Sequence, residues 1–303
     1  MALTIISGTS NLALSQAIAS HLGLTLGDCE ITRFLDSECR VYLKEDVKDR
    51  DVVVIQSLST IADQRLVELC LIGQAAKECG ARSVTAVIPW MGYSKQDKAF
   101  RKGEAISAQF VAKCIEVAGF DRVVACELHS ETVMPYFSIP VLEVSTHAIL
   151  SAAIAHIPDR ERVCVISPDT GGKSRSERFA VSTGLPIVYL DKTRDKKTGE
   201  VTVTGISGSV EHRPVVIFDD IINTAATAIK TSEFLYAHHV SDVYFLATHA
   251  VFAGSAVELL EQSPIRSVVV TDTIAQPASF HSKKISVVSV SSILADAIKR
   301  FVR

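Results

Sequence analysis

Short apolar runs alternate with helical segments along the chain, and this alternation most restricts the fold. We predict strands at Leu3–Ser7, Asp51–Gln56 and Ser83–Pro89, because each is rich in β-branched or other apolar residues and bounded by turn residues. Helices are predicted between them, over Asn11–Leu22 and Ile61–Gly80. A strand, a helix and a further strand in repeated succession are typical of parallel α/β units.

The same succession returns in the second half of the chain. Val165–Ser167 resembles Ile5–Ser7, and Val215–Ile217 resembles Val53–Ile55, in each case about 160 positions further along. Chance similarity among strands rich in Val and Ile is the alternative explanation. The pattern favours two tandem α/β domains, residues 1–145 and 146–303, each a mainly parallel sheet flanked by helices. The segment Cys29–Leu43 alternates more loosely, and we expect an antiparallel hairpin or flap there.

The charge and cysteine content exclude several classes of protein. The net charge is −3, with a pI near 6.3 and mixed signs along the chain, which argues against a nucleic-acid binder with a broad basic face. The seven cysteines are scattered without a Cys-x-x-Cys pair, so we expect reduced, buried thiols and neither a zinc site nor a disulfide framework. With no leader pattern and no apolar run of membrane-spanning length, the expectation is a soluble, cytoplasmic protein that does not bind membranes.

One strand–turn–helix stretch carries the clearest chemistry. The predicted strand Val215–Phe218 ends at Asp219 and Asp220, the small and hydroxylic residues Asn223–Thr227 follow, and a helix is expected from Ala228. The turn and helix N-terminus suit a phosphate, because N–H groups and the positive end of the helix dipole meet there. The two carboxylates would repel phosphate and are better suited to sugar hydroxyls or a Mg²⁺ ion. The plainer alternative is that they cap the helix.

Other polar segments also follow predicted strands. His129 comes just after the predicted strand Arg122–Glu127 and could be a metal ligand, a phosphate donor or an inert cap. Asp169 precedes Gly171-Gly172, which permits close approach of the backbone to an anion but also fits an ordinary turn. The loop Lys95–Asp97 could hold a triphosphate and a base, or be a solvated loop.

Two further segments permit both a functional and a structural interpretation. Phe34 lies beside Asp36 and Glu38, a set suited to stacking and hydrogen bonding with a purine, although a core Phe in a hairpin is commoner. Lys192 and Arg194 belong to a charged excursion after a predicted strand ending at Leu190. This excursion is either a solvated hairpin tip or a mobile loop that brings cations over a reacting phosphate.

In chain order, these segments resemble the ribose-phosphate pyrophosphokinase (phosphoribosyl pyrophosphate synthetase) family over nearly the whole length. The matching landmarks are Ser7–Asn11, Arg33–Glu38, Gly92–Asp97, Leu128-His129, Ser167–Gly172, Asp191–Arg194, Asp219–Thr227 and Thr248–Gly254. The resemblance implies two tandem phosphoribosyltransferase-like domains and a homo-oligomer. It also implies transfer of the β,γ-diphosphoryl group of ATP to the C1 hydroxyl of ribose 5-phosphate, giving phosphoribosyl pyrophosphate and AMP, with Mg²⁺ as cofactor.

The resemblance also assigns roles to individual residues. ATP would be bound by Phe34, Asp36 and Glu38, supplied by a neighbouring subunit, together with Lys95, Gln96, Asp97 and His129. Ribose 5-phosphate would be bound by Asp219, Asp220, Asn223, Thr224, Ala225, Ala226 and Thr227. Mg²⁺ would be held by His129 and Asp169, and the catalytic residues would be Lys192, Arg194 and His129.

Three residues depart from the family pattern and keep other functions open. Lys95 replaces the usual Arg, Asn223 stands where Asp is common, and Ala226 replaces a Gly. If the turn requires a positive φ at Ala226, the backbone there is strained by about 1 kcal/mol. A catalytically silent regulatory subunit of the synthetase is therefore the main alternative. A phosphoribosyltransferase is disfavoured, because such an enzyme is usually a single domain.

Overall fold

The computed structural model describes residues 2–168, 173–194 and 201–302, with the side chains of residues 192–194 and 201–204 left out. The chain forms two compact units. The first comprises Met1–Ser145, Thr273–Ala275 and Ser289–Arg303, and the second comprises Thr146–Asp272 and Gln276–Val288. The division therefore differs from two consecutive halves, because the C-terminal segment belongs to the first unit.

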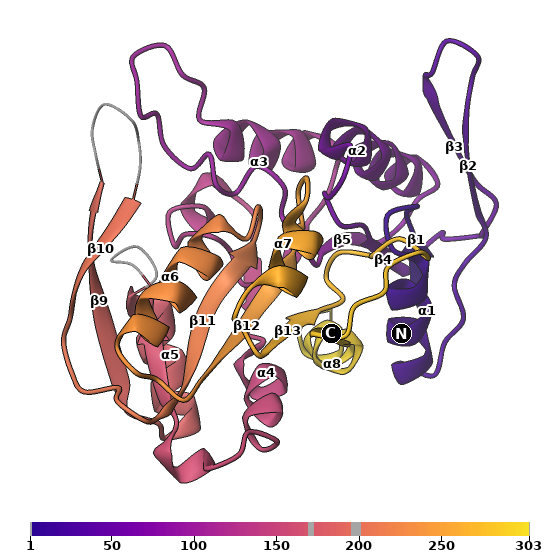
Figure 1. Ribbon diagram of the computed structural model, residues 1–303. Coiled ribbons are helices and arrows are strands. Elements are labelled where there is room, and N and C mark those ends of the chain that lie inside the picture. The colour runs from indigo at the N-terminus through magenta and orange to yellow at the C-terminus, as the bar shows by residue number, and fades with distance from the viewer. Residues whose placement is uncertain (1, 169–172, 195–200, 303) are drawn as a thin grey trace. The chain divides into compact units, whose positions relative to one another are not determined.

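The first unit is built on a parallel sheet of order β1-β4-β5-β6-β7 (Figure 1). Its strands are β1 Leu3–Ser7, β4 Asp51–Ile55, β5 Ser83–Ile88, β6 Arg122–Cys126 and β7 Val141–Val144. The helices are α1 Leu12–His21, α2 Ala62–Glu78, α3 Ser107–Val117, the short 3₁₀ helix η1 Met134–Tyr136, and α8 Ser291–Phe301. The strands β2 Cys29–Arg33 and β3 Cys39–Leu43 pair antiparallel and project from the sheet, which confirms the predicted hairpin.

The second unit contains a sheet of order β10-β9-β8-β11-β12-β13-β14, parallel except for the β9–β10 pair. Its strands are β8 Cys164–Ser167, β9 Ile187–Arg194, β10 Val201–Ile206, β11 Pro214–Ile222, β12 Asp242–Ala250, β13 Ser267–Thr271 and β14 Ile285–Val288. The helices are α4 His147–Ile154, η2 Arg160–Arg162, α5 Lys173–Thr183, α6 Ala226–Ala237 and α7 Ala256–Gln262.

The strand order confirms the predicted duplication. β8-β11-β12-β13-β14 follow one another in the second sheet as β1-β4-β5-β6-β7 do in the first. The central strands explain why the repeat is readable: all five residues of β4, Asp-Val-Val-Val-Ile, are buried. A strand that is covered on both faces favours β-branched residues at every position. Similar short sequences therefore recur at equivalent places in the two units. The protein is an α/β protein with two parallel-sheet units flanked by helices.

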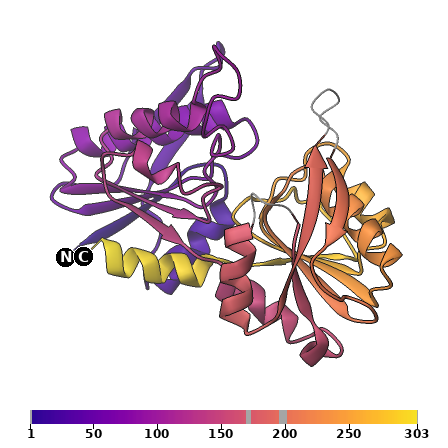
Figure 2. The ribbon, with the colours of Figure 1, turned by 90° about the vertical axis from the view of Figure 1, so that its left-hand side faces the viewer.

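Each repeat ends in a helix that packs in the other unit. α4 follows β7 after two residues but belongs to the second unit, whereas α8 follows β14 after two residues and packs on α1 and β7. Figure 2 shows the yellow α8 against the indigo and magenta elements of the first unit. Leu294 and Ile298 on α8 are fully buried there. The predicted assignment of residues 146–303 to one domain does not hold for Ser289–Arg303, which belongs to the first unit. The sequence could not predict this, because the apolar face of a helix does not reveal which sheet the helix covers.

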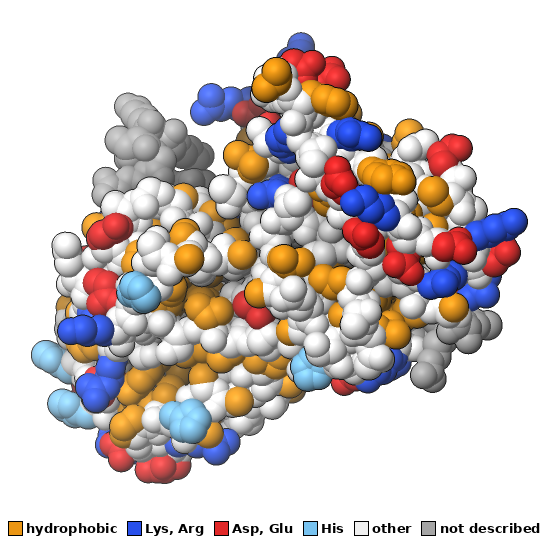
Figure 3. All heavy atoms as spheres, turned by 90° about the vertical axis from the view of Figure 1, so that its right-hand side faces the viewer, with side chains coloured by type: hydrophobic (Ala, Val, Ile, Leu, Met, Phe, Trp, Pro, Cys, Tyr) orange, Lys and Arg blue, Asp and Glu red, His pale blue; other side chains and the backbone are white. Residues whose placement is uncertain are grey.

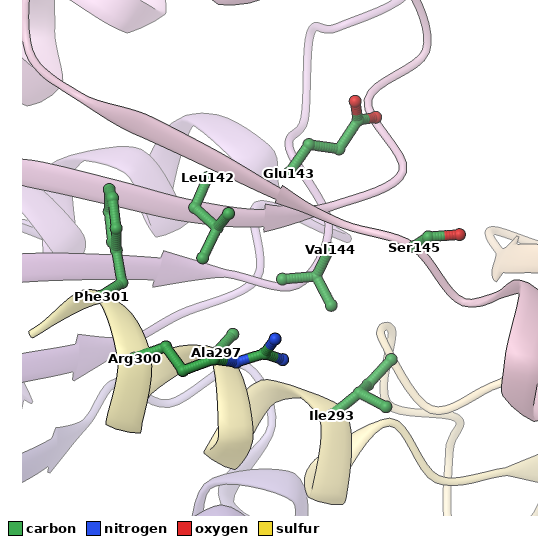
Figure 4. Close-up of a pocket in the computed structure, with 8 residues that line it drawn as sticks. All are labelled: Leu142, Glu143, Val144, Ser145, Ile293, Ala297, Arg300 and Phe301. Carbon is green, nitrogen blue, oxygen red and sulfur yellow. The ribbon is translucent and has the colours of Figure 1, made fainter.

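A cavity of about 370 Å³ lies between β7 and α8 (Figure 4). Leu142 and Val144 point from β7 toward the helix, and Ile293 and Arg300 belong to the facing side of α8. Glu143 points the opposite way, as expected from the alternation of side chains along a strand. The Glu143 carboxylate therefore faces away from α8, and it accepts a hydrogen bond from the N–H of Leu128 in the loop that carries His129.

The surface and the cysteines agree only partly with the expectations. On the side in Figure 3, Lys and Arg side chains are interspersed with Asp and Glu, as the mixed sequence charges predict. All seven cysteines are free, but only Cys126 and Cys164 are buried and Cys79 is exposed, so the expectation of uniformly buried thiols was wrong. No helix in the described part of the chain is long and apolar enough to cross a membrane.

Candidate functional site

The paired carboxylates lie inside β11 and not after its end. β11 runs to Ile222, four residues beyond the predicted end at Phe218, and Asp219 is still in register with Ala247 of β12. The Asp220 side chain is 1 % exposed and that of Asp219 is 19 % exposed. Arg175 of α5 pairs with both: its Nη1 atom lies 3.1 Å from Oδ1 of Asp219 and 2.9 Å from Oδ1 of Asp220. The interpretation as helix caps fails, since Ala225 occupies the N-cap position of α6.

In the turn after β11, the residue with a positive φ is Ala225, one position before Ala226. Ala225 is in the left-handed region with φ of 65°, whereas Ala226 is already the first residue of α6. The left-handed conformation costs about 1 kcal/mol for a residue with a Cβ. The replacement of Gly by Ala at position 226 therefore does not strain the turn through φ; Ala225 bears that cost.

The turn is braced by the segment after β12. The backbone N–H groups of Val251 and Phe252 donate to the carbonyl of Ile222, at 3.0 Å and 3.1 Å. The N–H of Ala253 donates to the carbonyl of Asn223 at 2.9 Å. These bonds hold the strained conformation in place, so the turn does not depend on a bound ligand for its shape.

The N-terminus of α6 has the features of an anion site. Among the described residues no side chain caps it, and its first turn contains no acidic residue. Thr224 and Thr227 are exposed there, while Ala225 is buried. N–H groups at a helix N-terminus and two accessible hydroxyls can surround a phosphate.

In the first unit, the loop with His129 is tied to the loop with Asp97. The Thr132 hydroxyl donates to the Asp97 carboxylate at 2.8 Å, and the Tyr136 hydroxyl donates to the Asp97 carbonyl at 2.5 Å. Burial opposes ionisation of Asp97, but hydroxyl donors from Thr132 and Ser130 outweigh it and hold its pKa below the ordinary value. Asp97 is therefore a carboxylate at neutral pH, and the two loops form one connected edge after β5 and β6.

The backbone beside His129 is also constrained. Glu127 has a φ of 30°, an unusual value for a residue with a side chain. The Leu128 N–H donates to the Glu143 carboxylate of β7 at 2.6 Å. His129 itself is partly exposed. The polar side of β7 thus orders the loop that carries this histidine.

Lys95 and Gln96 lie on the same loop as Asp97 but in different surroundings. Gln96 is exposed, and its side chain accepts a hydrogen bond from the Ser107 hydroxyl at 2.7 Å. Its carbonyl accepts from the N–H of Ala108 at 3.2 Å, so Gln96 supports the start of α3. Lys95 is partly exposed.

The tip of the β2–β3 hairpin presents the three residues predicted to meet adenine. Phe34 is 53 % exposed, so it is not a core residue of the hairpin. The Asp36 carboxylate accepts a bond from the N–H of Glu38 at 3.1 Å, and the N–H of Phe34 donates to the carbonyl of Glu38 at 2.9 Å. The tip is an ordered turn with an accessible aromatic face.

Of three further predicted residues, two are described by their backbone alone and one is not described. Lys192 and Arg194 lie in β9, which continues four residues past the expected end at Leu190 and pairs with β10. Asp169 lies outside the described residues. Within the described residues, no group of three or more His, Cys, Asp or Glu side chains could hold a metal ion.

Sequence reasoning missed a second polar cluster, beside the loop after β1. The Glu68 side chain of α2 is 2 % exposed. It accepts bonds from the Thr9 N–H at 2.6 Å, the Thr9 hydroxyl at 2.8 Å and the Gln56 amide at 2.7 Å. Arg65 lies 3.5 Å from the same carboxylate. An internal carboxylate thus fills the space beside the loop in the first unit.

The pairing of Arg175 with the two carboxylates was not predicted, although a signal was present. Arg175 comes directly after Gly171-Gly172-Lys173-Ser174 in the sequence. Two adjacent acids in a buried strand require a nearby cation, and this arginine is a candidate for it. A buried strand with two carboxylates, followed by a turn and a helix N-terminus suited to an anion, is an arrangement typical of α/β proteins that bind phosphorylated ligands.

Comparison with known proteins narrows this class. Residues 3–119 match the family described as the N-terminal domain of ribose phosphate pyrophosphokinase, and residues 145–303 match the phosphoribosyl synthetase-associated domain. The ribose-phosphate pyrophosphokinase of Caldanaerobacter subterraneus is 38 % identical over 298 residues, covering 98 % of this chain and 94 % of that protein. Ribose-phosphate pyrophosphokinase 2 of Arabidopsis thaliana, a chloroplastic protein, is 38 % identical over 300 residues, covering 98 % of this chain and 75 % of that protein.

A solved structure agrees with these sequence relatives. The phosphoribosylpyrophosphate synthetase of Mycobacterium smegmatis superposes with a TM-score of 0.92 at 29 % identity, covering 99 % of this chain and 98 % of that one. The chain belongs to the ribose-phosphate pyrophosphokinase family.

Proposed function

We propose that the chain is an active ribose-phosphate diphosphokinase. It transfers the β,γ-diphosphoryl group of ATP to the C1 hydroxyl of ribose 5-phosphate, and releases phosphoribosyl pyrophosphate and AMP. The observation that carries the proposal is the β11–turn–α6 element, with its paired carboxylates and its N-terminus uncapped by any described side chain. Full-length relatives that carry the name ribose-phosphate pyrophosphokinase support the same reaction.

In this proposal the second unit binds ribose 5-phosphate. The 5-phosphate is bound by the turn from Asn223 to Thr227, through backbone N–H groups and the two threonine hydroxyls. Asn223 is a neutral amide at a position where the family often has Asp. It therefore adds hydrogen-bond donors and removes the repulsion between a carboxylate and the dianionic 5-phosphate. Asp219 and Asp220 accept hydrogen bonds from the ribose hydroxyls.

The first unit binds ATP in this proposal. Phe34 stacks on adenine, with Asp36 and Glu38 as hydrogen-bond partners supplied by a neighbouring copy of the chain. Lys95, Gln96, Asp97 and His129 contact the remainder of the nucleotide. Lys95 binds phosphate as a point charge, without the two-pronged geometry of an arginine.

Mg²⁺ is best described as part of the substrate, MgATP. A hard cation with octahedral geometry is bound mainly by phosphate oxygens and water, with one or two protein ligands. The two residues that the resemblance assigns to Mg²⁺, His129 and Asp169, agree with that small number of protein ligands. Bound in this way, Mg²⁺ neutralises charge on the polyphosphate.

The residues proposed for catalysis are cations. Lys192 and Arg194 stabilise the charge spread over the transferred group during in-line attack by the sugar hydroxyl. His129 contributes a donor on the nucleotide side. No side chain is assigned as general base, because a loose transition state leaves deprotonation of the nucleophile late.

A catalytically silent subunit of a synthetase assembly is the second candidate. It is favoured by the match of residues 145–303 to a domain described as synthetase-associated, and by the departures at Lys95, Asn223 and Ala226. Such a subunit would keep the fold and the contacts between copies while lacking turnover. Retention of Lys192, Arg194, His129 and Asp169 favours activity.

One assay separates the candidates. The purified chain is incubated with ATP, Mg²⁺ and ribose 5-phosphate, and AMP is measured over time. An active synthetase forms AMP and phosphoribosyl pyrophosphate in equal amounts, and forms none without ribose 5-phosphate. Absence of AMP, with restoration by the double variant Asn223→Asp/Ala226→Gly, would establish the silent subunit.

A further inference from the structure

A single arginine links the two carboxylates of the proposed ribose site. Nη1 of Arg175 lies 3.1 Å from Oδ1 of Asp219 and 2.9 Å from Oδ1 of Asp220. The Arg175 side chain is 9 % exposed, so these are largely desolvated charges. The hydroxyl of the next residue, Ser176, donates to the carbonyl of Phe218 at 3.3 Å and fastens the start of α5 to β11.

This arrangement differs from that of an ordinary strand. Consecutive residues of a strand direct their side chains to opposite faces of the sheet. Here Asp219 and Asp220 both contact the same nitrogen atom, so the arginine fixes the position of one carboxylate relative to the other. Oδ1 of Asp219 also accepts a bond from the N–H of Asp220 at 2.9 Å, which further restricts that carboxylate.

The arginine also determines the charge beside the phosphate turn. Two carboxylates with no cation beside them would repel a phosphorylated sugar. A guanidinium remains charged at any pH the protein encounters, so it cancels one of the two negative charges beside the turn.

We propose that Arg175 is a positioning residue of the ribose 5-phosphate site, which holds Asp219 and Asp220 in the arrangement that recognises the ribose hydroxyls. The inference rests on the proposed function. Because Arg175 acts through the two acids, its loss should affect recognition of the ribose hydroxyls and not binding of the 5-phosphate. Loss of Arg175 should weaken binding of ribose 5-phosphate more than binding of an analogue that lacks one of these hydroxyls.

Binding without ATP tests this inference independently of turnover. Dissociation constants for ribose 5-phosphate and 2-deoxyribose 5-phosphate are measured by calorimetry for the wild type and for Arg175→Met, Arg175→Gln and Arg175→Lys. The wild type should prefer ribose 5-phosphate, and the preference should fall about tenfold or more in the Met and Gln variants. The Lys variant keeps the positive charge but not the shape of the guanidinium, so its preference should lie between those of the wild type and the Met variant.

A matched control uses an ion pair in the first unit. Arg82 pairs with Asp51 at the start of β4, so Arg82→Met removes an arginine–aspartate pair without touching the second unit. It should leave the preference unchanged. Thermal unfolding of each variant verifies that the protein compared is folded, and Arg175→Gln, which retains polar donors, serves if Arg175→Met does not fold.

The outcomes separate the two proposals. Wild-type protein that binds neither ligand refutes the ribose 5-phosphate site, and with it the proposed function. Wild-type protein that binds ribose 5-phosphate while the Arg175 variants weaken both ligands equally overturns the positioning role alone. A wild type without preference overturns it as well.

Discussion

Replacing the buried Glu68 should destabilise the first unit by several kcal/mol. In Glu68→Ala, the Thr9 N–H, the Gln56 amide and the Arg65 guanidinium lose their shared acceptor in a site that is 2 % exposed. Each unsatisfied buried donor costs about 1–3 kcal/mol, more when charged, and removal of one partner from a buried charge cluster costs about 3–5 kcal/mol. Glu68→Gln retains the shape but places an amide group against at least one donor, so we expect about 1–3 kcal/mol.

The assay has a natural reporter. Trp90 is the single tryptophan of the chain and is 5 % exposed within the first unit, so its fluorescence follows unfolding of that unit. With a urea dependence of about 2 kcal/mol/M, a loss of 3 kcal/mol lowers the unfolding midpoint by roughly 1.5 M. Glu78→Gln, at an exposed position of the same helix, is the control and should change stability by less than about 0.5 kcal/mol. If Glu68→Ala unfolds at the same urea concentration as this control, the carboxylate does not organise the loop.

The remaining predictions concern the proposed reaction. Lys192→Ala should lower kcat by roughly 10²-fold or more while the KM for ribose 5-phosphate changes little, as steady-state kinetics would reveal; near-normal turnover would leave only a solvated hairpin. Excess chelator should abolish AMP formation, and the double variant His129→Ala/Asp169→Ala should lose use of MgATP; full activity in chelator would contradict the metal requirement. Ala225→Gly should relieve the left-handed strain and raise the free energy of unfolding by about 1 kcal/mol, while neither it nor Ala226→Gly should change the KM for ribose 5-phosphate by more than about tenfold. A larger effect at Ala226 than at Ala225 would show that crowding by its Cβ outweighs the backbone conformation.

The duplicated sheet could be predicted from sequence because its strands are short, buried and rich in β-branched residues. Leu3–Ser7 forms a strand with the predicted bounds, and the hairpin expected within Cys29–Leu43 is β2–β3. Strand ends were less predictable: β11 continues through Asp219 and Asp220 to Ile222. Charged residues are unusual in a buried strand, so they suggest an end unless a partner such as Arg175 is known to neutralise them.

Long-range contacts account for what could not be predicted at the site. Two hydrogen bonds join segments that are separate in the sequence: one from Thr132 to Asp97 and one from Leu128 to Glu143. No local sequence pattern predicts either bond. The position of the positive φ was misjudged for a similar reason. Family spacing pointed to residue 226, but the start of α6 at Ala226 leaves the left-handed conformation to Ala225.

The exchange of α4 and α8 between the two units has a consequence for protein synthesis. The chain emerges from the ribosome N-terminus first, and domains usually fold as soon as their residues are available. Here the sheet of the first unit is complete at β7, but the apolar surface of α1 and β7 stays uncovered until α8 has been made. The nascent first unit must therefore remain unfinished during translation of the entire second unit. A ribosome that stops before Ser291 would release a chain whose defect lies in its N-terminal unit, although every missing residue is C-terminal.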